Sequence, residues 1–413
     1  MGEWFRGAGL GLFVHWDHAS QQGLELSWPL VGGLLPGMQS VPVEQYHSTA
    51  ASFDPTAWDP ASLAARARAC GMTYAVFTTR HHSGYALFDT ALSEFSVCHA
   101  RHGADLVRGF AEAMRAEGIR VGFYYSLSDW HHPDYPAFRE QDKPYTFFAS
   151  PPLPSAEQHE RYLEYLFGQV AELCTNYGQL DVMWFDGQWE RPAPWWRPTE
   201  LRALIRRLQP DCLVNDRLPG QGDFETPEQF LPAIPPEGRW ETCLTMNDSW
   251  GWRPDDQAYK SARSLIHTLC EVTARGGNLL LNVSPTGTGT LPDEQTRRLD
   301  ALAAWMAGHG PAVIGTEPGL APWQFYGPST RRGDTFYLHL LARPYDTVTV
   351  RGVPVRRVRQ VRVLGSGTVL AFSTRTAIVD FIHPDPLGEV TIEVPAAELD
   401  DMATVLAMEV SAP

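Results

Sequence analysis

Side chains that can move protons or bind a polar ligand follow short apolar runs at five places in the sequence. The motifs are FVHW, FTTRHHSG, FYYSLSDW, DVMWFDG and VNDR. They contain His15, His81, His82, Tyr124, Trp184, Asp186 and Arg217. Imidazole and guanidinium groups hydrogen-bond to hydroxyls, and aromatic rings cover the apolar face of a pyranose. If the fold brings these residues together, they form a polar, aromatic pocket of the kind that binds a sugar.

The apolar runs before these motifs must be neighbouring strands of one sheet for the side chains to converge. Seven runs qualify, at residues 10–14, 74–78, 121–125, 181–185, 212–214, 242–245 and 279–283. Most are continuously apolar, as parallel strands covered on both faces are, and amphipathic helical segments lie between several of them. This alternation predicts an α/β fold, and seven or eight units favour a (β/α)8-like, TIM-type barrel. The eighth strand is left unassigned, and no glycine-rich phosphate loop follows a run, which argues against a dinucleotide-binding sheet.

The last part of the chain has a different pattern. Stretches such as DTVTVRG and EVTIEV alternate with period two between Gly, Pro and Asp turn residues, which is typical of an antiparallel β-sandwich. We therefore expect a catalytic (β/α) barrel over residues 1–318 and a C-terminal β-sandwich over residues 319–413. The sandwich could bind carbohydrate or could support the barrel structurally, and we expect the structural role.

Composition excludes several classes of protein. The 413 residues include 33 basic and 48 acidic side chains, a net charge of −15 that argues against nucleic acid or an anionic membrane as partner. No apolar run approaches the ~20 residues that span a bilayer, and the first residues lack the pattern of a signal peptide. The six cysteines form no CxxC pair, so we expect reduced thiols. These features predict a cytoplasmic enzyme, and a homo-oligomer stays open.

Seven motifs in order carry a resemblance to a known family. They are GLFVHW, FTTRHHSGYALFD, GFYYSLSDW, DVMWFDG, VNDR, WETCLTMNDSWGW and ARGGNLLLNVSPTGTGTLP. Together they resemble the α-L-fucosidases of glycoside hydrolase family 29 from about residue 8 to about residue 317. The resemblance implies a barrel followed by a β-sandwich and an exo-acting enzyme without a cofactor. Such an enzyme removes terminal α-L-fucosyl residues from glycans or glycosides by double displacement, through a covalent fucosyl-aspartate.

The resemblance also implies the nucleophile. Asp186 in MWFDG matches the aspartate that serves as nucleophile in the family. A carboxylate at a strand end beside Trp184 and Trp189 is well placed to attack an anomeric carbon. Without the motif, an aspartate after a strand could equally cap a helix.

The acid/base is harder to assign, because loops align less securely than strands. It must protonate the leaving oxygen and later deprotonate water. The stretch GDFETPEQ resembles the family segment that carries this residue, and the alignment falls on Glu228. Glu241 in WETC is the runner-up. Asp223 and Glu225 also stay open, because the loop can be realigned by one to three residues.

By motif position, the family's fucose-contacting residues correspond to His15, His81, His82, Tyr124, Trp184 and Arg217. Glu25 and Trp28 in GLELSWPL lie where the family places a further acid and tryptophan. The sequence departs here, because Asp17 follows the first HW where the family commonly has glycine, so the loop can take another shape. Taken singly, each of these residues could instead be core packing or a structural ion pair.

Two other functions remain open. A catalytically silent fucose-binding barrel protein would bind the sugar without turnover, although Asp186 and a nearby glutamate argue against it. A metal-dependent amidohydrolase-like barrel would use the histidines. Adjacent residues in an extended segment point in opposite directions, so His81 and His82 should not share one ion, and we predict no metal site.

Overall fold

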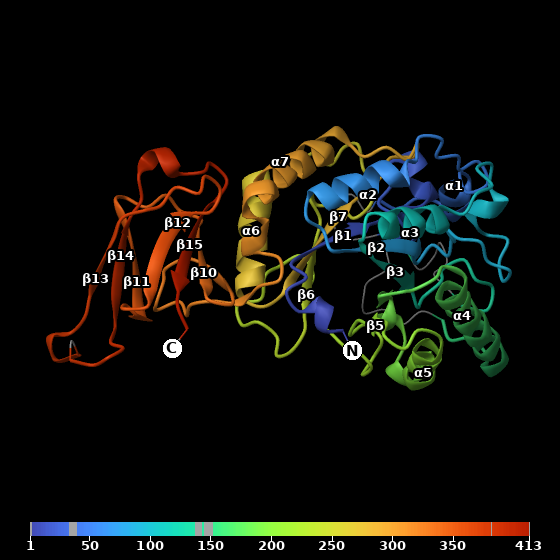
Figure 1. Cartoon of the computed structure of the whole chain (residues 1–413). Helices are drawn as coiled ribbons and strands as arrows, with labels where there is room; N and C mark the ends of the chain where they lie inside the picture. The colour runs from blue at the N-terminus through green and yellow to red at the C-terminus, as the bar shows by residue number, and fades with distance from the viewer. Residues whose placement is uncertain (1, 33–38, 137–142, 144–151, 381, 413) are drawn as a thin grey trace.

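A single parallel sheet forms the centre of the N-terminal part of the molecule. The computed structural model describes residues 2–32, 39–136, 143, 152–380 and 382–412. The seven strands of the parallel sheet are ordered β5-β4-β3-β2-β1-β7-β6, and each neighbouring pair is parallel. Their bounds are β1 Leu10–Val14, β2 Tyr74–Arg80, β3 Arg120–Ser126, β4 Val182–Asp186, β5 Leu213–Val214, β6 Glu241–Leu244 and β7 Asn278–Val283. The curled sheet with helices on its outer face confirms the predicted barrel-like α/β fold (Figure 1).

The helices follow the strands in the order that the sequence predicts. Their bounds are α1 Val43–His47, α2 Pro60–Ala69, α3 Leu106–Ala116, α4 Ala156–Asn176, α5 Pro198–Leu208, α6 Ala262–Ala274 and α7 Asp293–His309. Helix α3 shows why such segments form. Asp105 accepts a hydrogen bond from the Arg108 amide at its first turn, and Phe110 and Met114 are buried on one face.

An extended segment closes the gap between the two edge strands, β5 and β6. It makes isolated parallel bridges from Phe224 to Asn215, from Glu225 to Trp240 and from Glu228 to Cys243. Pro227 lies in the middle of the segment and has no amide hydrogen to donate, so a continuous ladder cannot form there. This irregular segment occupies the place of the eighth strand, which explains why no apolar run marks that strand in the sequence.

The inside of the barrel is filled by side chains from several strands and from the N-terminal segment. Its buried apolar residues are Phe5, Ala8, Phe13, Tyr74, Val76, Tyr124, Val182, Trp184, Leu213, Phe224, Cys243 and Leu280. Large rings need space beside small residues. A Cβ on Gly11 would lie 2.5 Å from the ring of Tyr74, so only glycine fits at this point of β1.

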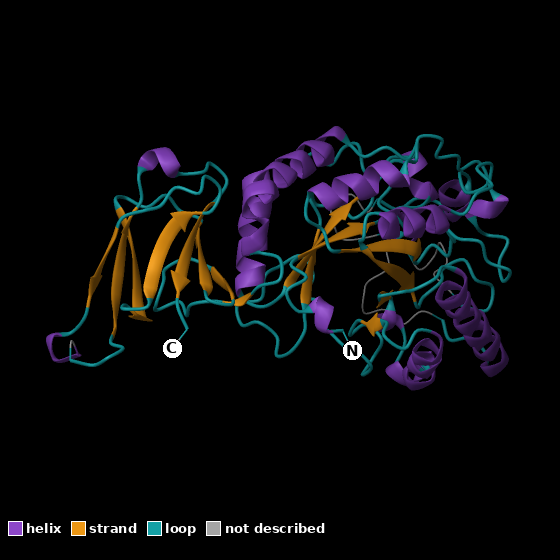
Figure 2. Ribbon diagram, in the orientation of Figure 1, coloured by secondary structure: helices purple, strands orange, loops and turns teal. Residues whose placement is uncertain are grey.

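The C-terminal part consists of two antiparallel sheets (Figure 2). The five-stranded sheet has the order β12-β15-β10-β9-β8, and the three-stranded sheet has the order β11-β14-β13. Their bounds are β8 Glu317–Pro318, β9 Ser329–Arg332, β10 Thr335–Leu340, β11 Thr347–Pro354, β12 Val358–Val363, β13 Phe372–Arg375, β14 Leu387–Glu393 and β15 Thr404–Val410. These sheets confirm the predicted β-rich C-terminal part. Because β8 already pairs with β9, the first two residues of this sheet lie before residue 319.

The C-terminal sheets rest on the helices of the barrel. The indole of Trp305 on α7 donates a hydrogen bond of 2.9 Å to the carbonyl of Ala403, and an imidazole nitrogen of His267 on α6 lies 2.8 Å from the carbonyl oxygen of Met402. Trp305 is only 4% exposed. These contacts join the two parts through a packed interface.

All six cysteines are free, as the sequence predicts. Across the described ranges, none of the helices combines the length and the apolar character needed to cross a bilayer.

Replacing Trp305 with alanine should lower the free energy of unfolding by about 3–5 kcal/mol, because it leaves a cavity between α7 and the C-terminal sheet. Trp323 offers a matched control. Its side chain is 81% exposed, so Trp323→Ala should change the free energy of unfolding by no more than about 0.5 kcal/mol. Guanidinium-induced unfolding of both variants measures the difference. Equal effects of the two substitutions would contradict this interface.

Candidate active site

Asp186 is the last residue of β4, and the chain turns away sharply after it. Gly187 has a φ of 76°, and a Cβ there would lie 2.5 Å from the hydroxyl of Ser128. The left-handed conformation therefore requires glycine next to the carboxylate. Asp186 Oδ2 accepts a hydrogen bond of 2.8 Å from the hydroxyl of Tyr124. Asp186 is 8% exposed, so it lies at the floor of a largely water-excluded site.

Arg217 joins Asp186 to a second carboxylate. Its Nη1 donates to Asp186 Oδ1 at 2.7 Å, and its Nη2 donates to Glu228 Oε2 at 2.5 Å. The guanidinium lies 4.5 Å over the ring of Trp184. Burial acts to lower the pKa of Arg217, but the two carboxylates outweigh burial and raise it well above its ordinary value. Arg217 is therefore a permanent cation between two acids.

Glu228 lies on the segment that closes the barrel. Its side chain is 37% exposed, whereas that of Asp186 is 11% exposed. Both acids bind the same guanidinium, so the two carboxyl groups face one another across the side chain of Arg217. One acid is held in the floor and the other faces solvent.

The other acid/base candidates have different surroundings. Asp223 forms ion pairs with Arg202 and Arg206, and Glu225 is exposed on the closing segment. Glu241 is fully buried inside the barrel. These positions favour Glu228, the only one of the four that bonds to the cation shared with Asp186 in the described part of the chain.

Glu241 supports the site from below. It accepts hydrogen bonds from the hydroxyl of Tyr74 at 2.5 Å and from the indole of Trp184 at 2.8 Å. Burial raises the pKa of its carboxyl from 4.5 to about 7. Glu241 thus fixes the ring on which the guanidinium of Arg217 rests.

Three histidines line the same end of the barrel, and each has one ring nitrogen bound by a neighbour. The pairs are His15 Nδ1 with Asn282 at 2.8 Å, His81 Nδ1 with Ser27 at 2.7 Å, and His82 Nδ1 with Ser126 at 2.6 Å. Burial lowers the pKa of His15 to about 4 and that of His82 to about 3, so both rings are neutral at pH 7. The Nε2 atom of His82 is buried, makes no hydrogen bond, and lies 3.7 Å from Asp186 Oδ2.

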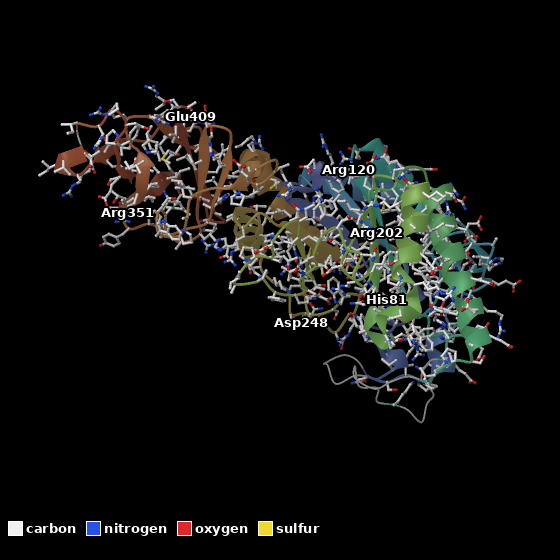
Figure 3. The ribbon with its side chains drawn as sticks, turned by 90° about the horizontal axis from the view of Figure 1, so that it is seen from below. His81, Arg120, Arg202, Asp248, Arg351 and Glu409 are labelled. Atoms are coloured by element: carbon white, nitrogen blue, oxygen red, sulfur yellow. The ribbon has the colours of Figure 1, made fainter. Side chains whose placement is uncertain are left out.

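The aromatic residues that the sequence singles out also meet here. The ring of Tyr124 stacks on that of His81 at 5.4 Å and on that of Trp184 at 5.6 Å, and His15 lies 5.3 Å from it. Figure 3 shows His81 within the barrel, at the far end of the molecule from Arg351 and Glu409 of the C-terminal sheets. The expected sugar-binding residues therefore form one cluster.

Glu25 and Trp28 lie close to the site in different ways. The ring of Trp28 is 5.5 Å from that of His82 and stacks on Trp189 at 6.5 Å. The carboxylate of Glu25 instead accepts hydrogen bonds from the backbone amides of Trp250 at 2.6 Å and Gly251 at 3.1 Å. Burial raises its pKa to about 8. In this arrangement Glu25 holds the backbone of Trp250 in place.

Asp17, at which the sequence departs from the family pattern, is buried at the start of the loop after β1. Its carboxylate accepts hydrogen bonds from the Ala19 amide at 2.7 Å and the Ser83 hydroxyl at 3.0 Å. It therefore ties the loop after β1 to the loop after β2. Burial raises the pKa of Asp17 to about 6.

Sequence reasoning missed two residues of this cluster. The ring of Trp250 lies 4.7 Å from that of His15, and Asn282 holds the imidazole of His15 while its amide donates to the carbonyl of Trp250. Both stand in motifs that carried the family resemblance, SWGW and LLLNVSP, and this position within a matched motif was the available signal.

One expectation about the histidine pair was wrong. The rings of His81 and His82 lie 4.1 Å apart at an interplanar angle of 52°, and the alternation of a strand does not apply to them because β2 ends at Arg80. Their ligand atoms and that of Asp186 all lie within 4.8 Å of one another. The absence of a metal site thus stays a prediction, and Asp186 is already paired with the cation of Arg217.

The α-L-fucosidase family model matches residues 1–311. The chain belongs to the α-L-fucosidase family. Tissue α-L-fucosidase of Bos taurus is 31% identical over 343 residues, which cover 76% of this chain and 69% of that protein. Tissue α-L-fucosidase of Homo sapiens is 28% identical over 406 residues, which cover 90% and 82% of the two chains. The chain is accordingly a glycoside hydrolase with α-L-fucosidase activity on fucosylated substrates.

Solved structures agree with this assignment. α-L-fucosidase isoenzyme 1 from Paenibacillus thiaminolyticus has a TM-score of 0.85 and 35% identity, covering 100% of this chain and 99% of its own. A GH29 α-L-fucosidase from Bacteroides thetaiotaomicron, described as a trapped covalent intermediate with 2-fluoro-fucosyl fluoride, has a TM-score of 0.82 at 24% identity and covers 99% and 95% of the two chains. The similarity extends over the barrel and the C-terminal sheets.

The buried acid Glu241 should make the stability of this fucosidase depend on pH. The folded carboxyl ionises near pH 7 and an unfolded one near 4.5, so raising the pH between these values favours the unfolded chain. The contribution of the protonated Glu241 carboxyl to the free energy of unfolding is fully present below pH 4.5 and is lost as the pH rises to 7. Because glutamine does not ionise, the free energy of unfolding of Glu241→Gln relative to wild type should rise by up to about 3 kcal/mol across this range.

Chemical denaturation of both proteins from pH 4.5 to pH 7 measures this difference. Other buried acids are common to both chains and cancel. A difference that stays constant across the range would show that Glu241 is already ionised in the folded protein at acid pH.

Proposed function

We propose that this protein is an exo-acting, retaining α-L-fucosidase in which Asp186 is the nucleophile and Glu228 the acid/base. The observation that carries the proposal is the single guanidinium of Arg217 bonded to both carboxylates, at 2.7 Å and 2.5 Å. It supports a pair of acids that can act on one glycosidic bond, one buried and one open to solvent. The covalent intermediate described for the Bacteroides thetaiotaomicron relative is consistent with this chemistry.

In the first step, the Asp186 carboxylate attacks the anomeric carbon of the fucosyl residue. Protonated Glu228 gives its proton to the glycosidic oxygen as the bond to the leaving group breaks, so the aglycone departs as a neutral alcohol. Arg217 and the hydroxyl of Tyr124 each donate a hydrogen bond to one oxygen of Asp186 and so orient the attacking carboxylate. The product of this step is a fucosyl ester of Asp186.

In the second step, Glu228 takes a proton from water while the water oxygen attacks the anomeric carbon. The ester bond breaks, fucose leaves with its configuration retained, and Asp186 regains its charge. Because the ester is uncharged, Glu228 is then the carboxylate that remains paired with Arg217. This pairing holds in place the carboxylate that must accept the proton.

The neutral imidazoles and stacked rings would bind the sugar. We propose His15, His81, His82, Tyr124, Trp184 and Arg217 as the fucose contacts, with Trp28 at the edge. His82 is the best supported, since its buried Nε2 has no protein partner and lies 3.7 Å from Asp186. A hydroxyl of the sugar would satisfy this atom. In the same proposal, residues 1–318 form the catalytic barrel, apart from β8 at their end, and residues 319–413 together with β8 form a sandwich that supports it.

Removing the nucleophile should abolish turnover. We expect Asp186→Asn to lower kcat for 4-nitrophenyl α-L-fucoside by at least about 10⁴-fold, because no carboxylate can form the ester. The amide keeps the size of the side chain, and circular dichroism checks the fold. Substantial turnover by Asp186→Asn would rule out Asp186 as the nucleophile, and sugar binding by a wild type without turnover would instead indicate a silent binding protein.

Removing the acid/base should give a different signature. Glu228→Ala should lose about 10²–10⁴-fold in kcat on the nitrophenyl substrate, because hydrolysis of the ester lacks its general base, and sodium azide should restore part of kcat, because azide needs no general base. The expected product is fucosyl azide of retained configuration.

Glu225→Ala is the matched control, since Glu225 is an exposed acid on the same segment and should leave the rate within about twofold of wild type. Azide rescue of Glu225→Ala, rather than of Glu228→Ala, would move the acid/base to Glu225.

A further inference from the structure

A third buried glutamate lies four residues after Asp186 and takes no part in the chemistry described above. Glu190 ends the short 3-10 helix Gln188–Glu190 and is 6% exposed. Its Oε1 accepts a hydrogen bond of 2.8 Å from the indole of Trp130, and its Oε2 accepts one of 2.5 Å from the hydroxyl of Tyr135. Both donors lie on the loop after β3, so Glu190 joins two loops at the carboxyl end of the barrel.

Trp130 in turn contacts His82 in two ways. Its backbone amide donates a hydrogen bond of 2.8 Å to the carbonyl of His82, and its ring lies 5.1 Å from the imidazole. Trp130 also packs against Trp28 at 6.0 Å. A shift of Trp130 would therefore move the imidazole whose Nε2 atom lies 3.7 Å from Asp186 Oδ2.

We propose that Glu190 is a positioning residue of the fucosidase reaction, which holds Trp130 and, through it, His82 at the correct distance from Asp186. The inference rests on the proposed roles of Asp186 and His82. The carboxyl of Glu190 lies on the loop that starts directly after the nucleophile, and Glu190 is four residues from Asp186 in the sequence.

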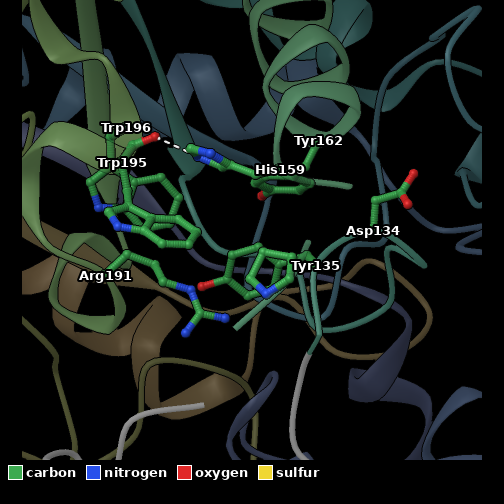
Figure 4. Close-up of a pocket in the computed structure, with 8 residues that line it drawn as sticks. Asp134, Tyr135, His159, Tyr162, Arg191, Trp195 and Trp196 are labelled. Carbon is green, nitrogen blue, oxygen red and sulfur yellow. Dashed lines mark hydrogen bonds between the residues drawn. The ribbon is translucent and has the colours of Figure 1, made fainter. Parts of the chain in front are cut away.

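The other side of Glu190 is tightly packed. Arg191 lies with its guanidinium carbon 5.0 Å from the ring of Tyr135 and donates a hydrogen bond of 2.9 Å to the carbonyl of Pro152. Figure 4 shows Arg191 beside Tyr135, with Trp195 and Trp196 next to them. The cavity left among these side chains is about 10 Å³, which is room for about one water molecule. Tyr135 is therefore held in place by tight packing and does not depend on its hydrogen bond to Glu190 for its position.

A carboxyl group suits this position because both partners are donors. A carboxylate accepts a hydrogen bond on each oxygen, whereas an amide has one acceptor and one donor end. In Glu190→Gln one of the two donors must face the NH2 group, and a buried, unsatisfied donor is costly. The substitution thus loosens the link without changing the volume of the side chain.

A double-mutant cycle tests the proposal. The variants are Glu190→Gln, Trp130→Phe and the double substitution, and the measurement is kcat/KM for 4-nitrophenyl α-L-fucoside. Calorimetric titration with a fucose-configured iminosugar counts the folded sites, so that loss of fold is not read as loss of rate. If Glu190 acts through Trp130, each single substitution should cost about tenfold, and the double variant should be no slower than the slower single one.

Tyr135→Phe is the matched control, because it removes the other hydrogen bond of the same carboxyl without touching His82. It should keep kcat/KM within about threefold of wild type. The proposal is overturned if Glu190→Gln has the wild-type rate per site, if the losses multiply in the double variant, or if Tyr135→Phe loses as much as Trp130→Phe. The cycle measures the coupling between Glu190 and Trp130, whichever carboxylate forms the bond to the sugar. An active Asp186→Asn would therefore refute the proposed nucleophile but would not change the measured coupling.

Discussion

The pairing of one guanidinium with two carboxylates is the interaction on which this active site depends. Arg217 follows β5, Asp186 ends β4, and Glu228 lies on the segment that joins the two edges of the sheet. The two acids can meet the same cation only if the barrel is closed at this seam. Closure by an irregular, proline-containing segment thus serves two purposes. It satisfies the backbone of β5 and β6, and it brings a solvent-facing acid to a buried one.

Buried acids bind the tryptophans that surround this pair of carboxylates. Glu241 binds the indole of Trp184, and Glu25 binds the backbone amide of Trp250. Glu190 binds the indole of Trp130 in the same manner. Burial raises the pKa of all three carboxyls, to between about 7 and about 8. The tryptophans are thereby fixed by directional bonds as well as by packing, which a rigid sugar ring requires of its binding site.

Sequence reasoning located the strands because continuous apolar runs are distinctive, and the structure places β1 on the predicted residues 10–14. It left the eighth strand open because a segment held by single bridges has no apolar pattern. It wrongly expected His81 and His82 to point in opposite directions. The two residues follow the end of β2, where side chains no longer alternate between the two faces of the sheet. It also could not show that Glu25 bonds to amides of residues more than 200 positions away. The motifs identified which residues belong to the active site, whereas their hydrogen-bond partners depend on tertiary contacts that the sequence does not show.

The most direct test of this account is where the fucosyl group becomes attached. Incubation of Glu228→Gln with 2-fluoro-fucosyl fluoride, followed by peptide mass spectrometry, should find one sugar per chain on the peptide that contains Asp186. The fluorine slows both steps, the activated fluoride still permits the first, and the missing base prevents the second. A label on another carboxylate, or none on a folded protein that binds fucose, would contradict the pairing of Asp186 with Glu228.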